Sequence, residues 1–134
     1  MVGRLRPAVK YVTLDYFDFL IKEVKDRRRL TVYDSEGIGS TIYGLTVFDG
    51  EYWLWKGLEK PFGLVEAIVV RRDAASREVI DAVLRDDRIV RLLSEGARQF
   101  GRVIAEYEEV LARAGYADVV EKVKAIVALS LLLA

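Results

Sequence analysis

The stretch "TIYGLTVFDGEYWLWK", residues 41–56, places two runs of β-branched and aromatic residues on either side of Asp49-Gly50. An Asp-Gly pair between such runs is a strong signal for a two-residue hairpin turn. We therefore predict antiparallel strands over 41–48 and 51–56. A two-residue turn also sets the register of the strands. The predicted facing pairs are Phe48 with Glu51, Val47 with Tyr52, Thr46 with Trp53, Leu45 with Leu54 and Gly44 with Trp55.

This register gives the hairpin two different faces. One face carries apolar side chains and is predicted to be core; it comprises Tyr43, Leu45, Val47, Tyr52 and Leu54. The other face carries Thr46 and the aromatic residues Phe48, Trp53 and Trp55. Trp55 can lie across the gap over Gly44, because glycine has no side chain. The aromatic face is either a surface for stacking or a second buried layer beneath helices.

Two further strands flank the hairpin, over residues 30–34 and 64–71. The segment "LVEAIVVR" at 64–71 is rich in β-branched residues, and a helix there is the alternative. Before these strands, Thr13 can cap a helix through "LDYFDFLIKEVKDRR", in which Phe17, Ile21 and Val24 recur at helical spacing.

From Asp73 onward the periodicity is helical. Asp73 or Ser76 caps a helix through Leu84, and Asp87 caps a longer helix that Gly115 ends. The long helix carries a seam of coiled-coil type, formed by Ile89, Leu93, Ala97, Phe100, Ile104, Tyr107, Leu111 and Ala114. A last helix runs from about Asp118 through "AIVALSLLLA" at 125–134, whose apolar character indicates burial between subunits, or else a central helix of one domain.

These elements predict an α+β fold with an N-terminal helix, a small antiparallel sheet of three to four strands, and C-terminal helices that form an association seam. We expect an α+β nucleic-acid-binding domain over residues 1–86 and a helical oligomerisation region over 87–134, or one continuous domain. A homodimer or a higher homo-oligomer is the expected assembly.

The composition narrows the possible chemistry. The chain has 134 residues, equal numbers of basic and acidic side chains, no Cys and no His. The usual disulfides, thiolate metal sites and histidine bases are therefore excluded. Asn is absent while Arg and Glu are plentiful, a pattern typical of hyperthermophiles. We expect no cofactor, no metal site and no enzymatic activity.

Neither a signal peptide nor a membrane span is predicted. No apolar h-region follows Arg4 and Arg6, and the apolar end at 125–134 is too short to cross a bilayer. We expect a cytoplasmic protein with no membrane partner.

The glycine-containing segment 35–40 resembles the start of a nucleotide fingerprint. The fingerprint needs a third glycine opening a helix, and Ile42 stands there instead, at the start of a strand. We interpret Gly37 and Gly39 as part of a strand connection; a phosphate-contacting backbone nest is the alternative.

Basic residues cluster near the aromatic face if the strands form a meander. Three arginines precede the first strand and two follow the last, which places all five at one end of the sheet. Aromatic rings beside cations form stacking surfaces for unpaired bases. The predicted nucleic-acid-binding residues are Arg27, Arg28, Arg29, Phe48, Trp53, Trp55, Arg71 and Arg72. The alternative is that neighbouring acids such as Asp26, Asp49, Glu51 and Asp73 neutralise the arginines.

Three functions follow from these patterns. The first is binding of single-stranded DNA, or RNA, by base stacking and arginine–phosphate contacts. The second is an assembly or scaffold subunit that binds protein and no nucleic acid. The third is a Mg²⁺-dependent nuclease using Asp34, Glu51 and Lys56, although the compact acid-x-lysine motif of such enzymes is absent.

The general plan resembles a known family. The N-terminal helix, the strands around "DGEYWLWK" at 49–56, the flanking arginines and the C-terminal seam resemble the ThermoDBP-type single-stranded DNA-binding proteins of hyperthermophilic archaea. This resemblance implies an α+β binding domain with an apolar cleft flanked by basic residues, and a leucine-zipper-like C-terminal region that joins subunits. In this sequence the resemblance implies a binding role for Trp53, Trp55 and the arginines.

Overall fold

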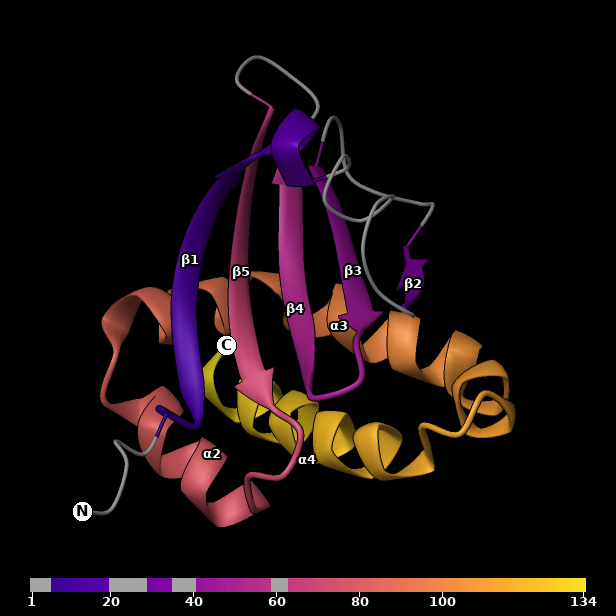
Figure 1. The fold of residues 1–134 in the computed structure, drawn as a ribbon. Helices are drawn as coiled ribbons and strands as arrows, with labels where there is room; N and C mark the ends of the chain where they lie inside the picture. Colours follow the sequence, from indigo (N-terminus) through magenta and orange to yellow (C-terminus); the bar gives the residue numbers. More distant parts are fainter. Residues whose placement is uncertain (1–5, 20–28, 35–40, 59–62) are drawn as a thin grey trace, which may run out of the picture.

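The computed structural model describes residues 6–19, 29–34, 41–58 and 63–134. Its elements are β1 (Val9–Asp15), β2 (Leu30–Tyr33), β3 (Thr41–Val47), β4 (Glu51–Leu58), β5 (Leu64–Arg71), α2 (Ser76–Leu84), α3 (Asp87–Arg113) and α4 (Ala117–Leu133). The strands form one antiparallel sheet in the order β1-β5-β4-β3-β2. In Figure 1, α3 and α4 lie behind the sheet, whereas the short helical turn at residues 16–19 lies in front of its upper end. The predicted α+β class is confirmed, with five strands in place of three to four.

The central hairpin has the predicted register. Thr46 faces Trp53 and Gly44 faces Trp55 across β3 and β4. The amide of Phe48 donates a hydrogen bond to the carbonyl of Glu51 at 2.8 Å, which closes the two-residue turn. Residues 64–71 are the strand β5, so the alternative of a helix at that position is wrong. Local turn chemistry and β-branched residues are sufficient to specify these strands.

The predicted helix start at Thr13 is wrong. Thr13 lies inside β1 and faces Glu66 of β5. Helical structure begins at Tyr16, and the Asp15 carboxylate caps it by accepting a hydrogen bond from the amide of Phe17 at 2.9 Å. β1 pairs with β5 along its whole length, from Val9 opposite Val70 to Asp15 opposite Leu64. The rest of the predicted helix, residues 20–28, and the glycine segment 35–40 lie outside the described residues.

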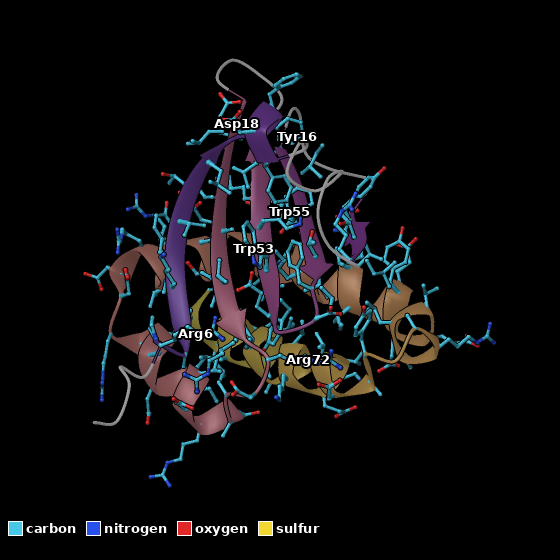
Figure 2. The ribbon with its side chains drawn as sticks, viewed as in Figure 1. Arg6, Tyr16, Asp18, Trp53, Trp55 and Arg72 are labelled. Carbon is cyan, nitrogen blue, oxygen red and sulfur yellow. The ribbon has the colours of Figure 1, made fainter. Side chains whose placement is uncertain are left out.

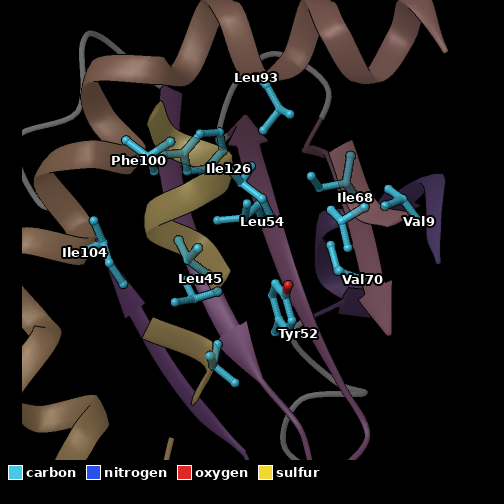
Figure 3. Close-up of a cluster of buried hydrophobic side chains, with 14 of the residues drawn as sticks. Val9, Leu45, Tyr52, Leu54, Ile68, Val70, Leu93, Phe100, Ile104 and Ile126 are labelled. Carbon is cyan, nitrogen blue, oxygen red and sulfur yellow. The ribbon is translucent and has the colours of Figure 1, made fainter. Parts of the chain in front are cut away.

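The main core fills the space between the sheet and the helices. It joins Leu45 and Ile68 of the sheet to Phe100 of α3 and Ile126 of α4 in one hydrophobic cluster, shown in Figure 3. Residues of both expected regions, 1–86 and 87–134, therefore contribute to the same core. A smaller cluster on the front face contains Phe19, Trp55, Val65 and Ala67.

The apolar seam of α3 faces this core. Ile89, Leu93 and Phe100 are buried against the sheet and α4, whereas Ala114 is exposed. Gly96 allows close approach, because a Cβ there would lie 2.5 Å from Tyr43 Cε1. The apolar seam of α3 is therefore buried largely within one chain.

The helix ends differ slightly from the prediction. Asp86, not Asp87, caps α3 by accepting a hydrogen bond from the Arg88 amide at 3.0 Å. The N-cap of α2 is Ala75, without a side-chain hydrogen bond, instead of Asp73 or Ser76. Gly115, with a φ of 95°, follows the C-cap of α3 as predicted.

Candidate nucleic-acid interface

The three predicted arginines that the structure describes, Arg29, Arg71 and Arg72, lie at one end of the sheet. Arg71 ends β5 opposite Glu51, and the Arg72 amide donates to the carbonyl of Gly50 in the hairpin turn at 3.0 Å. Arg29 directly precedes β2, whose first residue faces Val47 at the same end. Arg27 and Arg28 lie outside the described residues. Arg29 and Arg71 stand on strands three positions apart in the sheet, or about 14 Å at the usual strand spacing.

Arg71 is held by carboxylates. Its guanidinium pairs with Asp73 at 2.5 Å and with Glu78 at 3.3 Å, and it also donates to the carbonyl of Arg6. The hydrogen bond from Arg71 lowers the pKa of the Asp73 carboxyl. A phosphate would have to share Arg71 with these two acids, which weakens any contribution Arg71 makes to anion binding.

Arg72 ties the hairpin turn to α4. Its Nε and Nη2 donate to the two carboxylate oxygens of Asp118 at 2.8 and 2.9 Å. It also donates to the carbonyl of Asp49 at 3.3 Å, and its guanidinium lies 5.1 Å from the ring centre of Tyr116. The Arg72 hydrogen bonds lower the pKa of Asp118. A bidentate pair of this kind orients both side chains. Arg72 therefore helps to fix α4 against the hairpin turn.

Of the three predicted aromatic residues, two are buried. Trp55 is 4% exposed, donates its indole N–H to Thr46 Oγ1 at 3.1 Å, and has Phe19 at 5.5 Å between ring centres. Phe48 is 7% exposed and packs beside Trp53. Neither ring offers an open face to a base in this arrangement.

Trp53 is the predicted ring that remains accessible. It is half-buried, and its indole N–H donates to Glu51 Oε1 at 3.2 Å. Phe19 and Phe48 pack beside it, with ring centres 5.8 and 5.5 Å away. Figure 2 shows Trp53 on the front of the sheet, the side opposite α3 and α4.

Trp53 lines a pocket of about 530 Å³, which we call the outer-face pocket. Val12 and Leu14 of β1 and Val69 of β5 give it an apolar floor. Cationic side chains and one carboxylate complete its lining. The full lining set is Arg6, Pro7, Lys10, Val12, Leu14, Glu51, Trp53, Val69 and Arg71.

Sequence reasoning missed Arg6 and Lys10 as site residues. They lie beside the pocket because residues 9–15 form a strand next to β5, whereas these residues were expected to precede or begin a helix. The alternation of Lys10, Val12 and Leu14 on one face of β1 was the available signal.

The three residues of the nuclease alternative, Asp34, Glu51 and Lys56, do not lie together in one site. Asp34 is buried and lies 3.3 Å from Arg102, while Lys56 pairs with Glu95 at 3.3 Å. Glu51 stands five residues from Lys56 along β4, about 16 Å for an extended strand. Within the described ranges, no group of three or more Asp, Glu, Cys or His side chains could hold a metal ion.

A second, smaller pocket of about 180 Å³ lies between the sheet and the start of α3. Its charges are mostly paired: Tyr11 donates to Glu66 at 2.5 Å, and Arg88 stacks on the Tyr11 ring at 4.7 Å. Burial and the Glu66 contact raise the pKa of Tyr11 to about 12. This pocket has no apolar surface comparable with that of the outer-face pocket.

None of the helices in the described part of the chain is long and apolar enough to cross a membrane. Comparison of the chain with protein-family models, with curated proteins and with solved structures found no significant match.

Proposed function

We propose that this chain is a non-enzymatic protein that binds single-stranded nucleic acid on the front face of its sheet. One unpaired base stacks on Trp53 in the outer-face pocket, and Arg6 and Lys10 contact the adjoining phosphates. The observation that carries the proposal is the pocket itself, which combines an accessible indole, an apolar floor and a basic rim.

The size and chemistry of the pocket support this proposal. Its volume of about 530 Å³ lies within the range of roughly 300–1,000 Å³ typical of small-ligand sites. A base stacked on an aromatic ring contributes about 1–3 kcal/mol, and the interaction tolerates every base. Stacking on a side chain requires an unpaired base, which favours single strands over duplexes.

Phosphate binding in this proposal depends on exposed cations. Lys10 and Arg6 are exposed at the pocket, whereas Arg71 already has acidic partners. Arg29, and Arg27 and Arg28 outside the described residues, remain expected phosphate contacts. Each phosphate neutralised lowers the logarithm of the affinity by about 0.7 per tenfold rise in salt for single strands.

Fluorescence titration with oligo-dT at low salt tests the proposal. In a Trp55→Phe variant, Trp53 is the only tryptophan, so quenching on titration reports directly on the pocket. We expect quenching, and we expect Trp53→Ala to weaken binding about 5- to 150-fold, the equivalent of 1–3 kcal/mol.

Trp53→Phe is the matched control, because it keeps an aromatic face and should retain most of the affinity. Absence of quenching at low salt, or equal affinity of Trp53→Ala and wild type, contradicts the proposal.

A second candidate function, association as an assembly subunit, is favoured by the end of α4. Leu131 and Leu132 are 55% and 84% exposed, so two adjacent apolar side chains face solvent. If the chain associates through this end of α4, we expect Leu132→Glu to abolish the self-association measured by light scattering. Val110→Glu, at an exposed position of α3, leaves it unchanged. A monomeric wild type, or association that survives Leu132→Glu, argues against this interface.

A further inference from the structure

We propose that Arg71 is a positioning residue for the outer-face pocket. Its guanidinium holds the backbone of Arg6, so that the Arg6 side chain stands at the rim of the pocket and contacts phosphate. Arg71 makes no phosphate contact of its own in this assignment. The inference rests on the proposed function and replaces the role that the sequence predicted for Arg71.

The guanidinium of Arg71 donates hydrogen bonds from all three of its nitrogens within the fold. Nε donates to Asp73 Oδ1 at 2.5 Å, and Nη2 donates to both carboxylate oxygens of Glu78 at 3.3 Å. The remaining nitrogen, Nη1, donates to the backbone carbonyl of Arg6. Only 18% of the Arg71 side chain is exposed. A phosphate would therefore have to displace a bond that Arg71 already makes.

Two of the bonds from Arg71 hold the segment that leads into β1. The Arg71 amide donates to the carbonyl of Ala8 at 3.0 Å, and Nη1 donates to the carbonyl of Arg6. Pro7, between these two carbonyls, has a fixed φ and restricts the backbone further. A binding segment that is held in place beforehand loses less entropy when the ligand binds. Arg71 therefore prepares Arg6 for its contact with phosphate.

The two cations of the rim depend on Arg71 to different degrees. Arg6, Lys10 and Arg71 all line the outer-face pocket. Lys10 is placed by the sheet itself, because it lies opposite Val69 in the ladder between β1 and β5. That ladder begins at Val9, so Arg6 lies outside it. Figure 2 shows Arg6 at the lower end of β1, where β5 also ends. Arg6 is therefore the cation whose position depends on Arg71.

The test measures how the affinity for oligo-dT depends on salt, using the full chain in the Trp55→Phe background so that Trp53 reports binding. Each phosphate contact that is lost reduces the slope of log affinity against log salt by about 0.7 in magnitude. A general loosening of the pocket weakens stacking and leaves this slope unchanged. We expect Arg6→Met to reduce the slope by about 0.7.

Arg71→Lys separates positioning from charge, because it keeps a cation beside Asp73 and Glu78. Lysine lacks the planar fork with which arginine donates in several fixed directions. We expect Arg71→Lys to reduce the slope by about 0.7, as Arg6→Met does, and we expect the double variant to reduce it no further. Arg113→Lys, at an exposed position of α3, is the matched control and should keep the wild-type slope.

The outcomes separate the two proposals. A wild-type slope in Arg71→Lys overturns the positioning role of Arg71 and leaves the proposed function standing. Losses that add to about 1.4 in the double variant also overturn it, because Arg71 then acts independently of Arg6. Failure of wild type to bind oligo-dT at low salt overturns both proposals.

Circular dichroism checks that Arg71→Lys keeps the fold. Arg71→Gln is a second variant that replaces Arg71→Lys if the latter does not fold. Combined with Arg6→Met, it should show one loss of about 0.7 in the slope, and two such losses overturn the positioning role.

Discussion

The space above Gly44 is filled by the indole of Trp55. A Cβ added at Gly44 would lie 2.3 Å from Trp55 Cζ2, well inside van der Waals contact. Phe19 and Thr46 hold the indole on its other sides, so it has little freedom to move away. The hairpin register, the glycine and the buried tryptophan therefore depend on one another.

Gly44→Ala should destabilise the protein by about 1–3 kcal/mol, the usual cost of overpacking a well-filled core. Urea unfolding followed by circular dichroism measures the change. Gly50→Ala is the control, because a Cβ there meets nothing within 4 Å and the φ of Gly50 is not positive. Equal effects of the two substitutions contradict this account.

The Arg72–Asp118 pair gives stability a dependence on pH. The Arg72 hydrogen bonds lower the pKa of Asp118 in the folded state. Its contribution is therefore complete above the unfolded-state pKa of about 3.9 and is lost as the pH falls through the lower folded-state value. Asp118→Asn should cost about 1 kcal/mol at pH 7, a value reduced for partial solvent exposure.

Urea midpoints measured at pH 7 and at acidic pH check this prediction. The difference between Asp118→Asn and wild type should shrink as the pH falls below about 4. A difference that stays constant with pH assigns the loss to something other than the charge of Asp118.

At the scale of elements, the hairpin and the helices were predictable because their signals are local. Turn residues, alternation and helical spacing all act within about ten residues of one another. β1 carries only a short alternation of this kind, and its strand conformation depends on pairing with β5, which is distant in sequence. The same holds for the site. Trp53 was predicted as a site residue because its strand was predicted, whereas Arg6 and Lys10 were not, because β1 was expected to precede or begin a helix.

The start of α3 offers a prediction about one element. Asp86 accepts a hydrogen bond from the Arg88 amide, whereas the sequence pointed to Asp87 as the cap. Asp86→Ala should cost about 1 kcal/mol, and Asp87→Ala only a few tenths through the helix dipole. Thermal unfolding of the two variants measures the difference. The reverse order of stability would place the cap at Asp87.

At the scale of the whole molecule, one hydrophobic cluster joins the sheet to α2, α3 and α4. α4 supplies five hydrophobic side chains that are at most 8% exposed: Val119, Val120, Val123, Ile126 and Val127. Burying a side chain of this kind contributes about 1.5–3 kcal/mol. Their sum is comparable with the total stability of a typical domain, about 5–15 kcal/mol.

Deletion of residues 119–134 should therefore unfold the entire chain, including the sheet. Deletion of residues 131–134 is the control, since it removes the exposed Leu131 and Leu132 and leaves these five buried residues in place. Circular dichroism and tryptophan fluorescence should show one cooperative unfolding transition for the control and none for the longer deletion. A cooperative transition in the longer deletion would show that residues 1–118 fold independently.

The sequence by itself determined the strands β2 to β5, the register of the hairpin and the extent of the long helix. These features depend on backbone conformation and on periodicity, which are properties of neighbouring residues. The tertiary structure alone decided that Trp55 is buried while Trp53 is accessible, since Phe19 and the sheet neighbours cover one ring more than the other. It also decided that Arg71 and Arg72 have acidic partners and that the α3 seam is buried within the chain. Burial and ion pairing depend on which surfaces meet, and residues far apart in the sequence bring those surfaces together.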